Sequence, residues 1–518
     1  MNYLLALDAG TGSGRAVVFD ELGNQVASSA REWVHLNEKG VPGSMAFDFS
    51  NNWKLIVECI QDILTKVDAK DVVGISTTSM REGIVVYDQR GQELWACANV
   101  DARAVEEVKY LRQKRDDFEQ EMYRRSGQTF ALGAAPRLLW LKRHRPALYD
   151  QIAKISMLSD WIAFRLGAEI VVDPSNGGTS GLFNLNTRTW DVDIAEACEL
   201  RGEILSTPVV EGGTVIGEVS KAVAEETGLK QGTKIVMGGG DAQLGAIGVG
   251  IIKPNQTAVL GGTFWQQMVN VDYPLVDSSC KIRLNFAAMP NMWQAETIVF
   301  FPGLAVRWFR DAITPDIKAK AIESGRDPYT YLEEMAREVP PGSYRILPIY
   351  SDAMDYMHWR HAAPSILNLS LDPERTSRAA IFRALQENAA IVTRTNLDRI
   401  EKLTGKSDQS VTFAGGASKG FLWPQILADV LQKEVQIPVV KEATALGAAI
   451  NAGIGVGIYR NYEEAVQTVV KIERIYQPSR ENKEVYQDLY ERWLAAYPPQ
   501  LELADKGITE SMWRAPGE

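Results

Sequence analysis

The sequence has few cysteines and histidines for its length. Its 518 residues include four of each. The cysteines are scattered without a C-x-x-C pair, so we expect buried thiols rather than a disulfide framework or a zinc site. His358 and His361 have a spacing that a metal ion can use, but no carboxylate or cysteine cluster completes such a site. The composition therefore argues against a transition-metal centre.

Long apolar runs are also missing. No stretch approaches the roughly 20 apolar residues that a membrane-spanning helix needs. The first apolar stretch, Leu4–Leu7, is shorter than the core of a signal peptide and is broken at once by Asp8. We therefore expect a cytoplasmic protein with no membrane partner.

Positive charge is in deficit as well. The chain has 55 Lys and Arg against 66 Asp and Glu, a formal net charge of −11, which argues against nucleic acid as a partner. A hydrophobic fraction of 45% is that of an ordinary globular protein. Because 518 residues exceed one core, we predict two domains, 1–243 and 244–470, with a helical extension at 471–518.

Strand-like and helix-like stretches alternate along the chain and predict an α/β fold. Strands are expected at Tyr3–Leu7, Ala16–Phe19, Val72–Ser76, Ile84–Tyr87, Ile235–Met237 and Val411–Phe413. Helices are expected at Asn52–Lys66, Ala134–Lys142, Asp150–Leu166, Ser377–Leu403, Phe421–Leu431 and Ser479–Tyr497. The segment Val172–Trp190, rich in Asn, Gly, Ser and Thr, is predicted to be irregular surface structure.

The chain opens with two apolar runs around a turn of glycine and hydroxyl residues, which predicts a β-hairpin. Glycine lets the backbone approach a ligand closely, and exposed amides with the hydroxyls of Thr11 and Ser13 can donate to anionic oxygens. Arg15 adds positive charge, and Asp8 is placed to hold a metal ion through water. The spacing is not that of a P-loop. The candidate phosphate-binding residues are Thr11, Gly12, Ser13 and Arg15.

Two further glycine turns follow. Residues 257–269 repeat the opening design of strand, turn and strand around Gly262 and Thr263, which we interpret as an internal duplication. A third turn lies between a strand and a helix, where the thin backbone leaves room for an adenosine; it consists of Gly415, Gly416, Ala417, Ser418 and Lys419. Each turn alone is typical of ordinary structure. Together they predict a nucleotide held in the cleft between two domains.

Asp241 is the candidate catalytic residue. It follows three glycines at the end of a predicted strand, and a carboxylate there can orient and deprotonate an alcohol for phosphoryl transfer. It is also a second candidate metal ligand beside Asp8. The structural alternative is that Asp241 only caps the predicted helix Ala242–Ile247.

Two segments of the first half are candidates for binding a small polyhydroxylated substrate. Met80, Arg81 and Glu82 follow a strand, and an Arg–Glu pair can both donate and accept hydrogen bonds. Asn99, Asp101 and Arg103 follow Trp95 at another expected strand end. The alternatives are a surface charge pair for the first segment and an ion pair between Asp101 and Arg103 for the second.

These residues together resemble the FGGY family of carbohydrate kinases over essentially the whole chain. The resemblance implies a two-domain actin-like ATPase (ribonuclease H-like) fold with the nucleotide in an interdomain cleft. By that resemblance Asp8–Arg15 is the first phosphate motif and Gly261–Thr263 the second, Gly415–Lys419 is the adenosine motif, and Lys441–Ala449 is the helix that closes the family signature. It also implies ATP with Mg²⁺ as the phosphoryl donor and Asp241 as the catalytic base.

Other segments bear on the substrate by resemblance within the family: Ser79–Asp88, Trp95–Arg103, Asp173–Asn176, Gly261–Gln267, Arg307–Ala312 and Pro438–Gly447. They imply phosphorylation of the terminal hydroxyl of linear 4,5-dihydroxy-2,3-pentanedione, a quorum-sensing signal, and they add Trp265 to the substrate contacts. One alternative is a kinase of xylulose, ribulose or glycerol. Another is a non-catalytic actin-like nucleotide switch, which would need neither Asp241 nor the Arg81–Glu82 segment.

Overall fold

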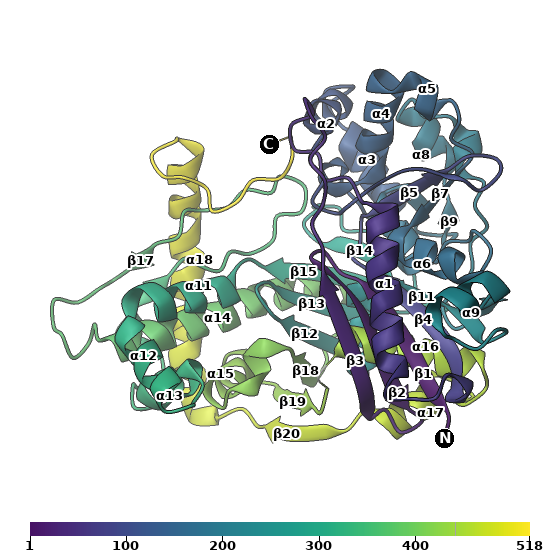
Figure 1. Ribbon diagram of the computed structural model, residues 1–518. Helices are drawn as coiled ribbons and strands as arrows, with labels where there is room; N and C mark the ends of the chain where they lie inside the picture. Colours follow the sequence, from purple (N-terminus) through teal and green to yellow (C-terminus); the bar gives the residue numbers. More distant parts are fainter. Residues whose placement is uncertain (441, 518) are drawn as a thin grey trace.

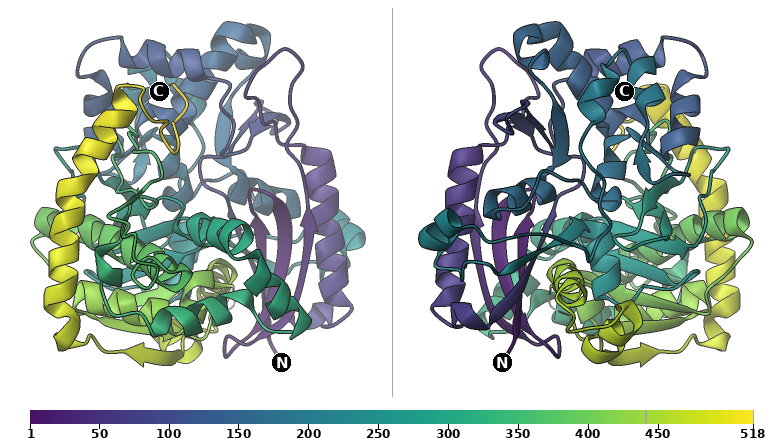
Figure 2. Two further views of the ribbon diagram at one scale, coloured as in Figure 1. Left: turned by 90° about the vertical axis from the view of Figure 1, so that its left-hand side faces the viewer. Right: turned by 90° about the vertical axis from the view of Figure 1, so that its right-hand side faces the viewer.

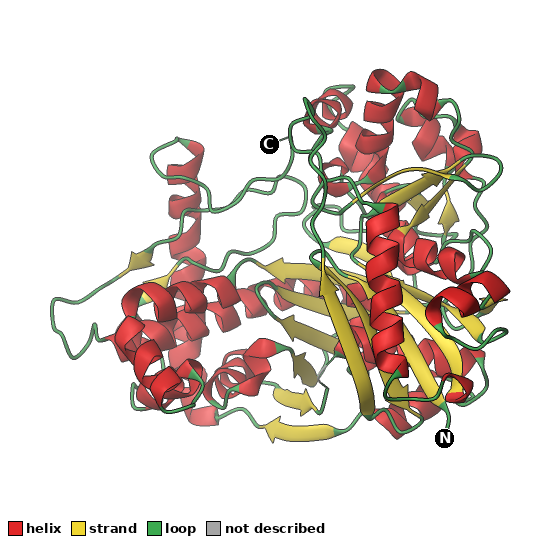
Figure 3. Cartoon of the chain, in the orientation of Figure 1, coloured by secondary structure: helices red, strands yellow, loops and turns green. Residues whose placement is uncertain are grey.

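The computed structural model describes residues 1–440 and 442–517, and its strands form two main sheets surrounded by helices (Figure 1, Figure 3). The N-terminal sheet has the strand order β10-β11-β4-β1-β2-β3. Its strands are β1 (Tyr3–Ala9), β2 (Ser13–Asp20), β3 (Gln25–Glu32), β4 (Val72–Ser79), β10 (Val215–Glu218) and β11 (Lys234–Gly240). Strands β1, β4 and β11 run parallel, whereas β1, β2 and β3 form an antiparallel meander.

The C-terminal sheet has the strand order β14-β15-β13-β12-β18-β19-β20. Its strands are β12 (Thr257–Gly261), β13 (Trp265–Val271), β14 (Arg283–Phe286), β15 (Trp293–Val299), β18 (Ser410–Ala414), β19 (Glu434–Pro438) and β20 (Ile472–Tyr476). Strands β12, β18 and β19 run parallel, whereas β12, β13 and β15 are antiparallel. The last strand, β20, lies in the part of the chain that the sequence assigned to a helical extension, so that part of the prediction is wrong.

The two sheets repeat one strand pattern. In each, a central strand (β1 or β12) turns back through a hairpin into an antiparallel neighbour and runs parallel to two later strands on its other side. The predicted internal duplication of architecture is therefore confirmed in the strand order. It places the two glycine turns at equivalent positions of the two halves.

Two helices lie between the sheets. Helix α16 (Ala443–Gly455) packs on β1, β4 and β11, and its partner α10 (Asp241–Gly248) buries Ala242 and Ala246 against the C-terminal sheet. Because α10 begins directly after β11, Asp241 stands where the N-terminal sheet ends and the interdomain layer begins.

Other helices cover the outer faces (Figure 2). Helix α1 (Phe49–Leu64) packs on β2 and β3, and α6 (Leu158–Leu166) packs on β4 and β11. Helix α14 (Arg378–Thr404) packs on β13 and β15, and α15 (Leu422–Leu431) joins it to the terminal helix α18 (Lys483–Asp505). Helix α18 buries Tyr486, Leu489 and Trp493, which confirms the predicted packing of the tail on the body.

A smaller sheet, β6-β5-β7, completes the N-terminal half beside helices of the upper lobe in Figure 1. Its strands are β5 (Ile84–Tyr87), β6 (Glu93–Cys97) and β7 (Lys154–Met157). The remaining elements are α2 (Val105–Arg112), α3 (Phe118–Ser126), α4 (Ala134–His144), α5 (Pro146–Tyr149), α7 (Pro174–Gly177), α8 (Val192–Ala197), α9 (Lys221–Thr227), α11 (Pro302–Trp308), α12 (Pro315–Glu323), α13 (Pro328–Arg337), α17 (Tyr462–Val469), β8 (Phe183–Asn184), β9 (Thr189–Trp190), β16 (Leu347–Pro348) and β17 (Ile366–Leu367).

Two predictions of local structure are wrong. The expected helix Asp150–Leu166 begins only at Leu158, because Lys154–Met157 pairs with β5 as a strand, and tertiary pairing overrides local propensity. The segment Val172–Trp190 is predicted to be irregular surface structure, but it contains α7, a short 3-10 helix and the strands β8 and β9, and its first part is interior. Asp173, Ser175 and Asn176 have no exposed surface, since hydrogen bonds within the protein replace those to water.

The cysteines, the helices and the histidines can each be placed in the structure. All four cysteines are free and buried. Among the described residues no helix is both long and apolar enough to cross a membrane. His361 is buried against Phe300, whereas His358 lies beside Asp355, and no cluster of three or more His, Cys, Asp or Glu side chains suited to a metal ion occurs in the described ranges.

Candidate functional site

A cavity of about 720 Å³ lies on the C-terminal half, against the second glycine turn and the third. This volume is within the range of small-molecule sites. Its walls come from the β12–β13 turn, from α11, α13 and α14, and from the turn before α15. Of the predicted cofactor residues it contacts Gly262, Thr263, Gly416, Ala417 and Lys419, and it adds Arg307, Tyr329 and Gln386 among others.

The two C-terminal turns form one surface. Gly415 has φ +100°, and a Cβ there would lie 2.5 Å from the carbonyl oxygen of Gly261. Only glycine permits both the conformation and the close approach. Ser418 is buried and donates to the carbonyl of Gly415 at 2.9 Å. It therefore stabilises the turn and does not line the cavity, unlike the prediction.

The first hairpin is closed by a hydrogen bond from the amide of Gly10 to the carbonyl of Ser13, 2.9 Å. Thr11 and Gly12 at its tip are exposed, as a loop that binds phosphate requires. Arg15 pairs with Glu442 at 3.2 Å, next to the start of α16. The signature helix α16 thus reaches the first hairpin, while Lys441 lies outside the described residues.

Asp8 and Asp241 are two neighbouring carboxylates at the junction of the halves. Burial raises the pKa of Asp8 to about 7, and the negative charge of Asp241 adds to the rise. The Oδ1 atom of Asp8 is buried without a hydrogen-bond partner in the described part of the chain. A cation between the carboxylates would supply both a partner and the missing positive charge. Mg²⁺ fits such a site because it uses one or two carboxylates, and water and phosphate oxygens complete its shell.

Asp241 is the first residue of α10, while Gly240 is the capping position. Its carboxylate accepts from the amide of Ala242 at 2.7 Å, and 41% of the side chain remains exposed. Burial nevertheless raises its pKa to about 6, although Arg81, 3.7 Å away, and the Ala242 amide act in the opposite direction. The carboxylate of Asp241 therefore contacts its own helix and still remains accessible.

Arg81 is engaged more fully than the sequence indicated. Its two terminal nitrogens donate to both oxygens of Glu296 on β15, one of them at 2.9 Å, and both side chains are buried. Burial alone would raise the pKa of Glu296, but Arg81 and Arg283 outweigh it and the pKa is lowered. The bidentate pair holds Arg81 beside Asp241.

Glu82 is fixed from several sides. It adopts φ +59°, which is uncommon for a residue with a side chain. Arg283 on β14 donates to its carboxylate, and Arg137 on α4 donates to its carbonyl at 2.6 Å. Met80 beside it is buried in the core of the N-terminal sheet.

Arg137 also joins the two predicted substrate segments. It donates to the carbonyls of Asn99 at 2.8 Å and Asp101 at 3.0 Å. Asn99 lies 3.4 Å from the hydroxyl of Thr11 at the first hairpin. The structure therefore brings the Arg81–Glu82 segment, Asn99 and the hairpin to one place.

Asp101, Arg103 and Trp265 are buried and engaged with other residues of the protein. Asp101 accepts from Arg103 and from the amide of Met45, and the guanidinium of Arg103 lies between the rings of Trp95 and Trp140. The ion-pair alternative thus describes this pair. Trp265 is fully buried against Phe413 and Trp423, because alternation along β13 turns its side chain into the core.

Sequence reasoning missed Glu296, Arg283 and Arg137. Each is a buried charged residue, and such residues are almost always paired. That signal identifies them as parts of a network but does not identify their partners, which lie up to 215 residues away.

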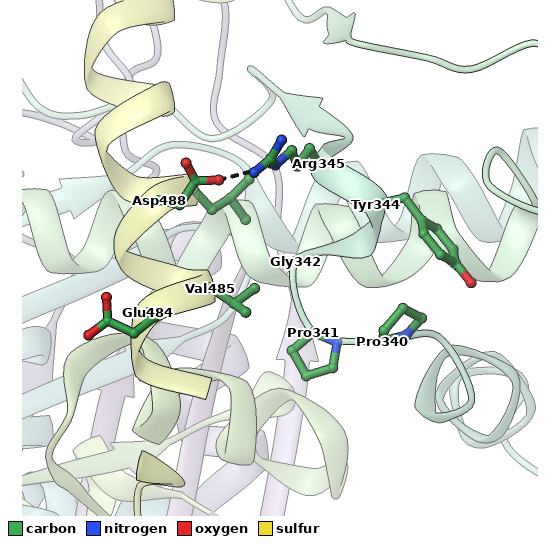
Figure 4. Close-up of a pocket in the computed structure, with 9 residues that line it drawn as sticks. Pro340, Pro341, Gly342, Tyr344, Arg345, Glu484, Val485 and Asp488 are labelled. Atoms are coloured by element: carbon green, nitrogen blue, oxygen red, sulfur yellow. Dashed lines mark ion pairs between the residues drawn. The ribbon is translucent and has the colours of Figure 1, made fainter. Parts of the chain in front are cut away.

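A second hollow of about 370 Å³ lies where α18 meets the loop after α13 (Figure 4). Pro340, Pro341 and Tyr344 of the loop and Glu484 and Val485 of α18 line it, and Arg345 pairs with Asp488 at 3.2 Å. None of the predicted site residues lines this hollow.

Comparison with known proteins agrees with this geometry. The family models for the N-terminal and C-terminal domains of the FGGY family of carbohydrate kinases match residues 3–248 and 273–456. Proteins named autoinducer-2 kinase from Salmonella paratyphi B and Yersinia enterocolitica are each 52% identical, over 100% of this chain and 98% of theirs. Among solved structures, a gluconate kinase from Lactobacillus acidophilus has a TM-score of 0.86 at 21% identity, covering 98% of this chain and 99% of its own. A xylulose kinase from Rhodospirillum rubrum has a TM-score of 0.83 at 24% identity, covering 97% of this chain and 100% of its own.

Proposed function

Because the chain belongs to the FGGY family of carbohydrate kinases, we propose that it transfers the γ-phosphoryl group of ATP to the terminal hydroxyl of linear 4,5-dihydroxy-2,3-pentanedione, the signal autoinducer-2. The enzyme class, a phosphotransferase with an alcohol as acceptor, follows from the family. The acceptor is supported by the full-length similarity to proteins named autoinducer-2 kinase. We place the reaction in the cytoplasm, as the sequence predicts.

The observation that carries the proposal is the position of Asp241. Its accessible carboxylate stands at the start of α10, close to Asp8 of the first hairpin and 3.7 Å from Arg81 of the acceptor segment. A kinase needs its general base between donor and acceptor, within reach of the hydroxyl proton.

The nucleotide side holds the donor. The adenosine occupies the cavity beside Gly416, Ala417 and Lys419, and the two hairpins at Thr11 and Thr263 donate backbone and hydroxyl hydrogens to the phosphates. Arg15 adds positive charge to the first hairpin. Asp8 and Asp241 would hold Mg²⁺, which when bound offsets the negative charge of the phosphate groups.

The acceptor side orients the hydroxyl. Arg81 and Glu82 are held by Glu296, Arg283 and Arg137, so they present fixed polar atoms beside Asp241. With a pKa of about 6, Asp241 is mostly ionised at neutral pH. It takes the proton as the hydroxyl oxygen forms a bond to the γ-phosphorus, and the bond from that phosphorus to ADP breaks.

Closure of the two halves around the substrates would exclude water from this site. Water is itself a hydroxyl acceptor, so exclusion prevents futile hydrolysis of ATP. This step adds no chemistry of its own, and it makes phosphoryl transfer depend on an acceptor being present.

A panel of acceptors tests the proposal. Purified protein is given ATP and Mg²⁺ with dihydroxypentanedione, xylulose, ribulose or glycerol, and ADP release and the phosphorylated product are measured. We expect the highest kcat/KM with dihydroxypentanedione. A higher kcat/KM with a pentulose or with glycerol would reassign the substrate within the family. ATP hydrolysis that no acceptor alters would instead support a nucleotide switch.

A further inference from the structure

The segment Asp173–Thr179 is polar in sequence and almost completely buried. It comprises α7 and the beginning of the next turn, and Asp173 and Asn176 within it have no exposed surface. Burial of so many polar groups is costly unless each finds a partner. The partners of this segment are therefore informative, and they lie at the ends of the strands that carry the proposed reaction.

One contact reaches the strand that leads to the catalytic carboxylate. The amide of Gly240, the residue before Asp241, donates to the hydroxyl oxygen of Ser175 at 3.0 Å. The same hydroxyl donates its proton to Asp173, so its lone pairs face Gly240. A Cβ on Gly239 would lie 2.4 Å from this hydroxyl, which explains why a glycine precedes the contact.

A second contact reaches the acceptor segment. The amide of Glu82 donates to the hydroxyl oxygen of Thr179 at 3.1 Å, and that hydroxyl donates to the carbonyl of Asn176 at 2.6 Å. Because Glu82 has φ +59°, its backbone keeps this conformation only if its surroundings determine it. Thr179 holds the amide of Glu82, while Arg137 holds its carbonyl and Arg283 its carboxylate.

A third contact fixes the segment itself. The side-chain amide of Asn176 donates to the hydroxyls of Ser79, at the end of β4, and of Ser159, in α6, each at 2.9 Å. The ends of β4 and β11 and the residue Glu82 thus share a single buried segment as their common support.

We propose that Ser175 and Thr179 are positioning residues for phosphoryl transfer: Ser175 sets the place of Asp241 through Gly240, and Thr179 sets the place of Glu82 toward the acceptor. The inference rests on the proposed function, since it assigns Asp241 and Glu82 their roles. Neither hydroxyl touches the reacting atoms. Their removal should therefore change the two kinetic constants in different ways.

The test compares Ser175→Ala, Thr179→Val and Thr179→Ser with the wild type. A buried amide that loses its hydrogen-bond acceptor moves toward another acceptor. The free-energy cost of one lost hydrogen bond corresponds to a change of about tenfold in rate or affinity. Ser175→Ala should lower kcat about tenfold with the KM of both substrates nearly unchanged. Thr179→Val should raise the KM of the acceptor about tenfold and leave the KM of ATP unchanged. Thr179→Ser keeps the hydroxyl, so its kcat and KM values should equal those of the wild type.

Thr187→Val is the matched control, because that threonine is exposed and its hydroxyl is hydrogen-bonded to the hydroxyl of nearby Thr189. If Thr179→Val does not fold, Thr179→Ala removes the same hydroxyl with a smaller side chain. The proposal would be overturned if kcat and both KM values changed equally and in step with a loss of thermal stability. It would also be overturned if Ser175→Ala and Thr179→Val had wild-type kinetics.

The variants are assayed with the acceptor that wild-type protein turns over fastest in the panel. If the proposed substrate is wrong, the acceptor panel with wild-type protein shows it. If the positioning roles are wrong, the kinetics of the variants show it.

Discussion

The nucleotide side and the acceptor side of this site are built in opposite ways. The proposed nucleotide side has two glycine turns at a cavity of about 720 Å³, and Gly415 brings the backbones of the two turns close together. The acceptor side consists of charged side chains that are buried and paired, such as Arg81 with Glu296 and Glu82 with Arg283. Backbone recognition depends on the shape of the turns. Recognition by buried charges depends on every partner being present.

This contrast implies that the two sides respond separately to mutation. A change in a glycine turn should weaken nucleotide binding and leave acceptor binding unchanged. Loss of a buried charge should weaken acceptor binding and leave nucleotide binding unchanged. Asp241 belongs to both, since it lies near Asp8 and 3.7 Å from Arg81.

The largest expected effect is at this shared residue. Asp241→Asn keeps the shape of the side chain but removes the base, and we expect kcat to fall by about 10²–10⁴. Binding of ATP, measured by calorimetry, should persist. A variant that turned over at near wild-type rate would refute the role of Asp241 as general base.

On the acceptor side, Glu296→Ala leaves Arg81 charged and buried without its main partner. Breaking a buried ion pair in this way costs about 3–5 kcal/mol of unfolding free energy. We also expect the KM of the acceptor to rise while the affinity for ATP is unchanged. Glu473→Ala is the control, because that glutamate is exposed on the edge strand β20. Equal losses of ATP and acceptor affinity would contradict the separation of the two sides.

On the nucleotide side, Gly415→Ala introduces a Cβ at φ +100° and 2.5 Å from the carbonyl oxygen of Gly261. The strain is about 1–3 kcal/mol, and we expect ATP affinity to fall while the KM of the acceptor is retained. Gly405→Ala is the control, since that glycine also has positive φ, at 68°, but a Cβ there meets nothing within 4 Å. Unchanged ATP affinity in Gly415→Ala would show that this turn does not shape the nucleotide site.

The same contrast explains what the sequence could predict. Glycine turns such as Gly415–Lys419 are local patterns, so their place between strand and helix could be read directly, and four of these five residues form part of the cavity wall or of its close packing. The partners of Arg81 and Glu82 could not be read, because Glu296 and Arg283 are 215 and 201 residues away and pair only when the two halves pack together. The surroundings of Asp101 and Trp265 could not be read either, since Asp101 is hydrogen-bonded to the backbone of Met45 and Trp265 is packed against Trp423.

The last prediction concerns stability rather than catalysis, and it is a pH dependence at Asp8. Its folded pKa of about 7 exceeds the unfolded value of 3.8, so the folded protein binds the proton more tightly. Stability from this group is therefore fully present below pH 3.8, is lost as pH rises toward 7, and is level above that, with a slope of at most about 1.4 kcal/mol per pH unit. In thermal denaturation without nucleotide, the difference between wild type and Asp8→Asn should follow this curve. Mg²⁺ with a nucleotide should flatten it, because a cation bound to Asp8 holds the carboxylate ionised. A difference that is constant from pH 4 to 8 would mean that burial does not raise the pKa of Asp8, and that the carboxylate finds its compensating charge within the protein.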